Sequence, residues 1–553
     1  MKNRIKQYLL AASMCVGLTA CSDFFEPIPG VQFGLDETFA SKQRTEEYLN
    51  NVYSYVREVT DAIHPNTYGG IFTEASLDGA NRWNKTYAEW TNGSFNSASA
   101  QASEYFSKYY QAIAKASTFI QNVDKCTEAA ASTRGKWKSE ARALRAYYYF
   151  ELLRLYGPIP LIGEDPIPLD ASLEELIKER NSVDECVNFI ATELQSAIDS
   201  GDLLQRAGKA NLGRMDVATC MALKAKLYLY WASPLFNGNT DQASVKNKDG
   251  RQLFPQTEDN SKWTQARDAY ERFMTFATGQ GYKLTEVYTN GKLDPYASCR
   301  AAGEFFTTTW EAVDELIFVK LRDLYDYTYW VCPKFTDFQD TDVTGGGGYY
   351  TTQETVDLFF TKDGLTIEED PGYDKFEGIP SANNFTSGRY YDPNNPSRLY
   401  FDADKSKVLK QWKDREPRFY VNITYSGSIW LNEGKYNEEM RTDFTNGANG
   451  TCGKSKASGD CPDSGYLIRR GAKASNNNGS KHFSPVLRLA DMYLGYAEAL
   501  CMCSDLDNAL TYLNKIRVRA GIPEYTFTAT AGKITCPKTQ TDLLNRIRRE
   551  RLV

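Results

Sequence analysis

A helix-forming segment that combines small and aromatic residues occurs three times in this chain and restricts the folds open to it. In these small-and-aromatic copies, alanines stand where two helices would approach most closely, and tyrosines fill the gaps beside them. Helix pairs of this kind build tetratricopeptide-like arrays, in which each pair packs against the next. The period of about 34 residues of a regular array is not kept, so the repeats are irregular. The copies lie at residues 142–150, 222–230 and 488–496, and we expect the tyrosines at 147–149 in the core.

The composition divides the chain into three regions. Residues 37–280 are mostly helical, and their clearest helix is 136–156, where apolar residues recur three or four positions apart. Gly157 then stops this helix. Residues 281–483 are rich in Gly, Asn, Asp, Thr and Tyr and contain short alternating segments typical of strands. Because helices return in residues 484–553, we predict a mostly α-helical fold of tetratricopeptide-like repeats with a large loop-rich insertion that carries short strands.

The N-terminus has the features of a lipoprotein signal. Residues 1–20 have a positively charged start, an apolar stretch and small residues before Cys21. The order Leu18-Thr-Ala-Cys21 is the pattern of bacterial lipoprotein signals, and an ordinary secretory peptide with a chance cysteine is the alternative. Acylation of Cys21 would hold the protein firmly on a membrane, with residues 21–36 as a lipidated tether. No other stretch has the about 20 apolar residues that span a bilayer, so we expect an anchored protein.

Cysteine usage agrees with export. Of the 12 cysteines, Cys15 lies in the signal and Cys21 is the lipidation site, which leaves ten in a compartment that permits disulfides. Cys452 and Cys461 lie in a polar, glycine-rich loop. We expect this pair to be bridged.

Charge and residue types argue against several functions. Acidic residues outnumber basic ones by 71 to 64, so attraction to nucleic-acid phosphates is not expected. The two histidines, His64 and His482, stand near no G-x-S-x-G or catalytic-cysteine signature, and we expect no enzyme, although close carboxylate pairs leave a glycosidase open on sequence alone. Asp337, Asp340 and Asp342 could hold a structural Ca²⁺, but they lack EF-hand spacing. A solvated turn is the favoured interpretation there, and no cofactor is expected.

Two segments combine aromatic rings with polar side chains at positions that do not form the apolar face of a helix. The chain has 36 Tyr, 28 Phe and 9 Trp, more rings than a core requires. Sugar binding uses flat aromatic faces to cover the sugar ring and polar side chains to bond its hydroxyls. For both segments, packing of the rings in the core is an equally weighted alternative to ligand binding. The candidate ligand-binding residues are Asp78, Asn81, Arg82, Trp83, Trp90 and Asn92 in the first segment and Tyr325, Tyr327, Tyr329 and Trp330 in the second.

Five motifs resemble, in order along the chain, those of the SusD/RagB family of outer-membrane nutrient-binding lipoproteins. The first is residues 141–161 (ARALRAYYYFELLRLYGPIPL), the most recognisable segment of that family. The others are residues 349–364, 414–418 (DREPR), 485–499 (PVLRLADMYLGYAEA) and 513–521 (LNKIRVRAG). One motif alone would be weak evidence, whereas five in order together with a lipoprotein signal are strong evidence.

The resemblance implies an α-helical fold with four tetratricopeptide-like repeats and a loop-rich ligand face. It implies a protein on the outer face of the outer membrane, held in the lipid by acylated Cys21, and the acidic run 22–26 resembles the surface-export signals of Bacteroidetes lipoproteins. Such a protein captures an oligosaccharide and passes it to a SusC-like, TonB-dependent transporter. In the family, the loop after the first helix and the region corresponding to 325–330 supply ligand contacts. The peptide-binding RagB branch is the alternative, and a structural scaffold is a third possibility.

The last residues depart from the family pattern. Residues 548–553 resemble the start of the closing helix of the family, and the aromatic-containing stretch that usually follows is missing. We therefore expect the region 484–553 to be truncated, with the surface that the closing segment would cover left exposed.

Overall fold

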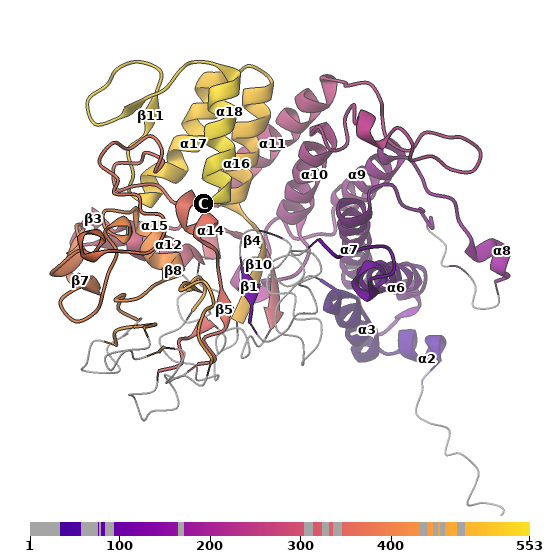
Figure 1. The fold of residues 1–553 in the computed structure, drawn as a ribbon. Helices are drawn as coiled ribbons and strands as arrows, with labels where there is room; N and C mark the ends of the chain where they lie inside the picture. Colours follow the sequence, from indigo (N-terminus) through magenta and orange to yellow (C-terminus); the bar gives the residue numbers. More distant parts are fainter. Residues whose placement is uncertain are drawn as a thin grey trace, which may run out of the picture.

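A helical array and a loop-rich region with short strands lie side by side in the computed structural model of this chain (Figure 1). The mostly α-helical fold with a loop-rich insertion that the sequence predicts is confirmed. The residues that the structure describes are 34–56, 76, 79–82, 93–163, 167, 171–303, 313–322, 331–335, 345–430, 440–445, 452–453, 459–472 and 482–553.

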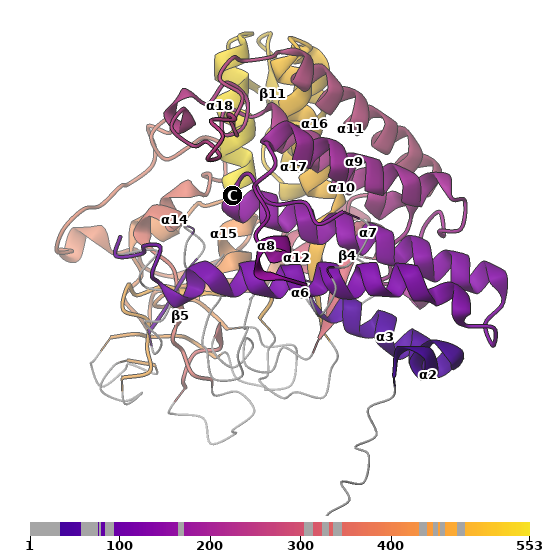
Figure 2. The ribbon, with the colours of Figure 1, turned by 90° about the vertical axis from the view of Figure 1, so that its right-hand side faces the viewer.

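The helices of the array pack against one another in chain order. They are α2 (Leu35–Ala40), α3 (Lys42–Ser54), α6 (Ala100–Asn122), α7 (Ala131–Tyr156), α9 (Val183–Asp199), α10 (Val217–Ala232), α11 (Ser261–Gly279), α16 (Leu489–Met502), α17 (Leu506–Ala520) and α18 (Gln540–Leu552). Helix α6 packs on α7, α7 on α9, α9 on α10, α10 on α11, and α11 on α16, which also contacts α17 and α18. Figure 2 shows α6, α7, α9 and α11 stacked one above another. One hydrophobic core runs through the array from α2 to α18.

Helix α7 carries the first alanine- and tyrosine-rich copy. It begins at Ala131, before the predicted start, and ends where the sequence predicts, with Gly157 in the left-handed region at φ 69°. The tyrosines at 147–149 are buried, as predicted. The hydroxyl of Tyr148 donates a hydrogen bond to the carbonyl of Val52, so this ring also joins α7 to α3.

A glycine lets α16 and α11 approach closely. A Cβ atom added to Gly495 in the third copy would lie 2.2 Å from the hydroxyl oxygen of Tyr270. Tyr270 is buried, and its ring stacks on that of Tyr496 with centroids 6.2 Å apart. The small residue in this copy is therefore required by the helix contact.

The short strands and short helices lie mostly in the loop-rich region, and some lie between the helices of the array. Four strands form an antiparallel sheet in the order β1 (Ala80–Asn81), β5 (Tyr349–Tyr350), β9 (Leu467–Ile468) and β8 (Ile423–Thr424). The other pairs are β4 (Leu316–Arg322) with β10 (His482–Arg488), β2 (Tyr288–Thr289) with β3 (Lys292–Leu293), β6 (Arg389–Asp392) with β7 (Asn395–Asp402), and β11 (Tyr525–Thr526) with β12 (Ile534–Thr535). The shorter helices are α8 (Leu173–Leu176), α12 (Pro295–Gly303), α14 (Gln353–Leu358), α15 (Pro417–Asn422) and the 3₁₀ helices η1 (Val123–Lys125), η2 (Lys209–Asn211), η3 (Thr240–Gln242), η5 (Ala382–Asn384) and η6 (Lys410–Trp412).

The loop-rich region has an aromatic core of its own. The rings of Tyr400 and Tyr420 stack with centroids 3.9 Å apart, and those of Phe419 and Tyr425 stack at 5.3 Å. Many of the aromatic rings that we counted as available for ligand binding therefore fill the interior of the loop-rich region, which has little regular secondary structure.

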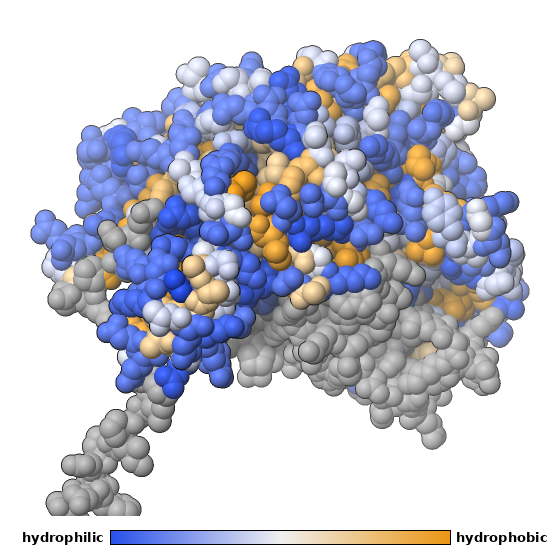
Figure 3. All heavy atoms as spheres, turned by 180° about the vertical axis from the view of Figure 1, so that it is seen from behind, coloured by the Kyte–Doolittle hydropathy of each residue, from blue (hydrophilic) through white to orange (hydrophobic). Residues whose placement is uncertain are grey.

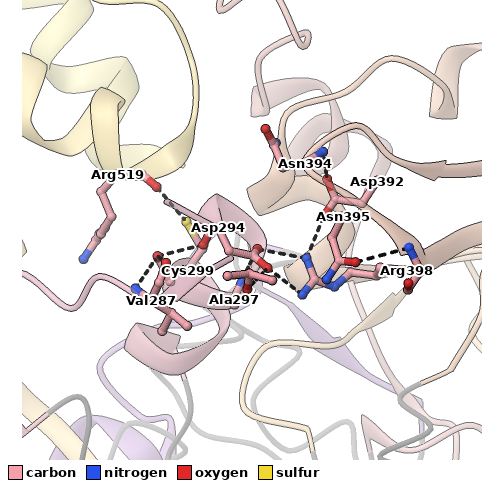
Figure 4. A network of polar contacts seen from close by, with 12 residues as sticks. Val287, Asp294, Ala297, Cys299, Asp392, Asn394, Asn395, Arg398 and Arg519 are labelled. Carbon is pink, nitrogen blue, oxygen red and sulfur yellow. Dashed lines mark hydrogen bonds and ion pairs between the residues drawn. The ribbon is translucent and has the colours of Figure 1, made fainter. Parts of the chain in front are cut away.

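An arginine between two buried carboxylates joins two hairpins in this region (Figure 4). Arg398 of β7 lies 2.9 Å from both carboxylate oxygens of Asp294 and 2.6 Å from Asp392. Burial alone would raise the pKa of Asp294, but hydrogen bonds from Arg398 and from the N–H of Ala297 outweigh it and lower that pKa below its ordinary value. The β2–β3 hairpin and α12 are thereby fixed to the β6–β7 hairpin.

The surface opposite to the view of Figure 1 is mainly hydrophilic, with apolar residues in small groups (Figure 3). Among the residues that the structure describes, no helix is long and apolar enough to cross a membrane. Cys21 lies outside the described residues, and α2 begins at Leu35, so the helical array starts inside the predicted tether 21–36.

Replacement of Gly495 tests the close contact of α16 with α11. Gly495→Ala should lower the free energy of unfolding by about 1–3 kcal/mol through overpacking against Tyr270, although alanine is the better helix former by about 1 kcal/mol. Gly279→Ala is the matched control, because Gly279 is the last residue of α11 and has open space around its Cβ position. This variant should not lower the free energy of unfolding. Denaturant unfolding of both variants measures this, and an equal response of the two would contradict the packing argument.

The lowered pKa of Asp294 predicts a loss of stability in acid. A carboxyl with a lower pKa in the folded than in the unfolded chain stabilises the fold above its unfolded pKa of about 3.9, and this contribution is lost as the pH falls through the folded pKa. Asp294→Asn should therefore flatten the decline of the free energy of unfolding between about pH 5 and pH 3. Asp249→Asn, at an exposed position, should leave that slope unchanged.

Candidate ligand-binding site

The structure describes two of the ten predicted ligand-binding residues. Asn81 is the last residue of β1, which pairs with β5 through Asn81 and Tyr349, and Arg82 follows directly. The predicted residues outside the described part of the chain are Asp78, Trp83, Trp90, Asn92, Tyr325, Tyr327, Tyr329 and Trp330, and the same holds for Asp337, Asp340 and Asp342 of the calcium alternative. In the described residues, no group of three His, Cys, Asp or Glu side chains is arranged to hold a metal ion.

Arg82 is bound by a turn that lies far along the chain. Its guanidinium forms an ion pair with Asp463 and donates a hydrogen bond to the carbonyl of Cys461 at 3.2 Å. The N–H of Arg82 donates to the carbonyl of Gly348 at 3.0 Å. The side chain of Arg82 thus contacts the protein itself at the point where the first predicted segment begins.

The flank of the second predicted segment packs on the same glycine run. The N–H of Gly347 donates to the carbonyl of Cys332 at 2.9 Å, and that of Gly345 donates to the carbonyl of Pro333 at 3.0 Å. A Cβ atom on Gly347 would lie 2.9 Å from the carbonyl oxygen of Asp460 and 3.2 Å from the backbone nitrogen of Lys334. Only glycine, which also tolerates φ 58° here, allows this approach.

We call the set formed by Arg82, residues 332–334, 345–348 and 459–463 the glycine junction. Lys334 and Asp460 add an ion pair within it. Arg82 directly precedes Trp83, and residues 332–334 follow closely after Trp330. Arg82 and residues 332–334, which lie far apart in the sequence, are therefore brought together in the same small cluster.

Buried ion pairs join α15, the helix that directly precedes β8, to the helical array. Arg418 lies 2.6 Å from Glu416 and 2.6 Å from Glu550 of α18, and Arg517 of α17 lies 3.2 Å from Glu550. All four side chains are buried. Because β8 directly follows α15, this ionic cluster fixes one edge of the β1-β5-β9-β8 sheet to the helical array.

A second buried pair fixes the strand that leads to the other aromatic segment. Arg519 of α17 lies 2.8 and 2.9 Å from the two carboxylate oxygens of Glu315, and the N–H of Thr285 donates to Glu315 at 2.8 Å. Burial would raise the pKa of Glu315, but Arg519 and Arg488 hold it below its ordinary value. Glu315 directly precedes β4, and β4 ends at Arg322, just before the segment 323–330.

In the sequence, these charged motifs indicated only a family resemblance, and their role in buried ion pairs was not predicted. Arg517 and Arg519 alternate with Ile516, Val518 and Ala520, and Arg418 directly precedes the segment Phe419-Tyr-Val421, a pattern that indicates buried ion pairs. The contacts of Asp463 and Gly347 in the glycine junction were also not predicted. Asp463 stands in a polar turn and Gly347 in a glycine run, and neither shows its partner locally.

The expected disulfide is not formed. Each of the ten cysteines in the described part of the chain is a thiol, including Cys452 and Cys461, so the prediction of a bridge between these two was wrong. The backbone groups of Cys452 and Cys461 have different hydrogen-bond partners. The N–H of Cys452 donates to the carbonyl of Asp443, whereas the carbonyl of Cys461 accepts from Arg82.

Comparison with known proteins agrees with the motifs. The model of the SusD family matches residues 315–553, and a second model, described as starch-binding associating with outer membrane, matches residues 32–229. These two ranges take in most of the chain. The chain belongs to the SusD family.

Individual relatives are distant in sequence and similar in fold. A SusD-like protein of Bacteroides ovatus is 27% identical over 175 residues, a stretch that covers 30% of this chain and 30% of that relative. The protein BT4246, whose structure is solved, is 24% identical over 93% of this chain and 86% of its own, with a TM-score of 0.72. A SusD-like carbohydrate-binding protein of Bacteroides fragilis is 18% identical over 93% of this chain and 83% of its own, with a TM-score of 0.62. These structures share the fold of this chain.

Removal of a buried arginine tests the ionic cluster. Arg418→Met should lower the free energy of unfolding by about 3–5 kcal/mol, because it leaves the buried carboxylates of Glu416 and Glu550 without their shared partner. Arg548→Met, on the half-exposed face of α18, is the matched control and should change it by less than about 0.5 kcal/mol. Equilibrium denaturation measures both, and a small loss for Arg418→Met would contradict the role given to the cluster.

Proposed function

We propose that this protein binds a glycan at the cell surface and delivers it to a SusC-like, TonB-dependent outer-membrane transporter. The observation that carries the proposal is the glycine junction, which brings together Arg82, the neighbour of Trp83 in the sequence, and residues 332–334, which follow Trp330 in the sequence. Membership of the SusD family supports it, since one matching model is described as starch-binding associating with outer membrane. The name of the carbohydrate-binding relative from Bacteroides fragilis points the same way.

Binding in this proposal is by contact alone, with no chemical step. Trp83, Trp90 and Trp330 would cover the apolar faces of sugar rings, and Asn81 and Asn92 would bond hydroxyl groups at their edges. Asp78, Tyr325, Tyr327 and Tyr329 complete the proposed ligand-binding residues. A shallow, partly polar site of this kind gives affinities of about millimolar to micromolar.

The proposed location is the outer face of the outer membrane. Acylation of Cys21 would hold the chain in the lipid, and residues 22–33 would link the lipid to α2. Capture beside a transporter raises the effective concentration of the ligand at the transporter, which compensates for modest affinity.

Affinity electrophoresis against plant, host and microbial polysaccharides tests the proposal. The protein should be retarded by one class of glycan, and Trp83→Ala or Trp330→Ala should abolish the retardation. Tyr288→Ala, which removes an aromatic ring 59% exposed on the β2–β3 hairpin outside the glycine junction, is the matched control and should be retarded as before. Absence of retardation by every glycan would favour the peptide-binding alternative, and shortening of a glycan on incubation would indicate an enzyme.

A further inference from the structure

We propose that Arg469 binds a small inorganic anion, of the size and charge of chloride, in the interior of the loop-rich region, with the hydroxyl groups of Thr424 and Tyr425 as further donors. Arg469 directly follows β9, and its N–H donates to the carbonyl of Asn422 at 2.7 Å, which continues the pairing of β9 with β8. Only 6% of the residue is exposed. The site is independent of the proposed glycan-binding residues.

Arg469 differs from the other buried arginines because its charge has no acceptor in the protein. In the part of the chain that the structure describes, six arginines are buried. Four of them pair with buried carboxylates, which are Glu193 for Arg145, Glu416 and Glu550 for Arg418, Glu550 for Arg517, and Glu315 for Arg519. The fifth, Arg415, donates to the carbonyls of Val356 and Phe359, both at 2.8 Å. The side chain of Arg469 has neither an ion pair nor a hydrogen bond with any described residue, and its Nε atom is buried.

The groups around Arg469 supply no negative charge. Burial lowers the pKa of Arg469 below its ordinary value, and the titratable side chains that act on this pKa are Tyr296, Arg300, Tyr425 and Tyr400. Tyrosine side chains are neutral at pH 7, and Arg300 is a second cation. A buried cation without a counter-charge is strongly unfavourable, so the surroundings of Arg469 favour the entry of an anion.

Two buried hydroxyl groups in the same place also have no hydrogen-bond partner among the described residues, those of Thr424 and Tyr425. In the pairing of β8 with β9, Thr424 lies opposite Leu467, which stands two residues before Arg469, so Thr424 and Arg469 share one face of the sheet. Buried hydroxyl groups nearly always have a partner. A single anion can accept hydrogen bonds from the guanidinium and from both hydroxyl groups.

The surroundings restrict the shape and size of the ion. The ring of Trp430 lies 5.6 Å from the guanidinium carbon of Arg469, so it covers one face of the guanidinium and leaves the N–H groups at the edge. Because only 6% of Arg469 is exposed, an ion about as large as a water molecule can reach it, whereas a sugar ring cannot. One negative charge neutralises one guanidinium, and a monovalent ion of the size of chloride meets both conditions.

Thermal unfolding of the full chain in sodium chloride, with sodium gluconate added to hold the ionic strength constant, tests the site. Raising chloride from about 1 to about 100 mM should raise the thermal midpoint of the wild type by about 2–4 °C, because the ion binds only the folded chain. Arg469→Met removes the charge and keeps a long side chain, so its midpoint should not respond to chloride. Arg267→Met, which removes a partly exposed ion pair with Asp268 on α11, is the matched control and should respond as the wild type does.

A second variant and a crystal experiment decide the question if Arg469→Met does not fold. Thr424→Val keeps the shape of the side chain and removes one donor, so this variant should need about tenfold more chloride for the same shift of the midpoint. In crystals grown with sodium bromide in place of chloride, the anomalous signal of a bromide ion should lie beside Nε of Arg469.

Three results would overturn the inference. If the midpoint of the wild type does not respond to chloride and no bromide lies beside Arg469, water alone satisfies these groups. If Arg469→Met or Thr424→Val responds as the wild type does, chloride binds elsewhere. If bromide is found only at other places in the crystal, the same conclusion holds. None of these results bears on glycan retention, so the proposed function is tested separately.

Discussion

Two arginines on α17, Arg517 and Arg519, hold the loop-rich region onto the helical array. Arg517 pairs with Glu550 and donates to the carbonyl of Gly364 at 2.8 Å, and Arg519 pairs with Glu315. Removing charges from water is costly, so these groups are stable only because each has several well-placed partners. Glu550 also meets Arg418, which belongs to α15. Strand β4 directly follows Glu315 and ends just before one predicted aromatic segment. Strand β8 directly follows α15, and β1, at the other edge of the same sheet, ends just before Arg82 and the other segment.

The arrangement separates a fixed frame from the loops that would contact the ligand. The helical array, the aromatic core around Tyr400 and Tyr420, and the pair of Arg398 with Asp294 and Asp392 are all built from buried contacts (Figures 1 and 4). Loops on a fixed frame can change in sequence without loss of the fold, which is why binding residues are so often found on them. In this protein the glycine junction is the place where frame and loops meet.

The sequence alone predicted the parts of this structure that depend on local pattern. The helix over 136–156, its end at Gly157 and the burial of the tyrosines at 147–149 all follow from spacing and from glycine. Contacts between distant residues leave no such pattern. Arg82 and Asp463 are 381 positions apart, and Asp463 resembles any solvated aspartate in a turn. The aromatic content also misled, because many tyrosines and other rings of the loop-rich region are buried in its own core.

Hydrogen–deuterium exchange with and without a retained glycan tests most directly whether the two aromatic segments form one site. We predict that the glycan slows amide exchange in residues 78–92 and 323–330 together, in proportion to the fraction of protein bound, and leaves the exchange in α17 unchanged. Slower exchange in only one of these segments, or only elsewhere on the molecule, would contradict it.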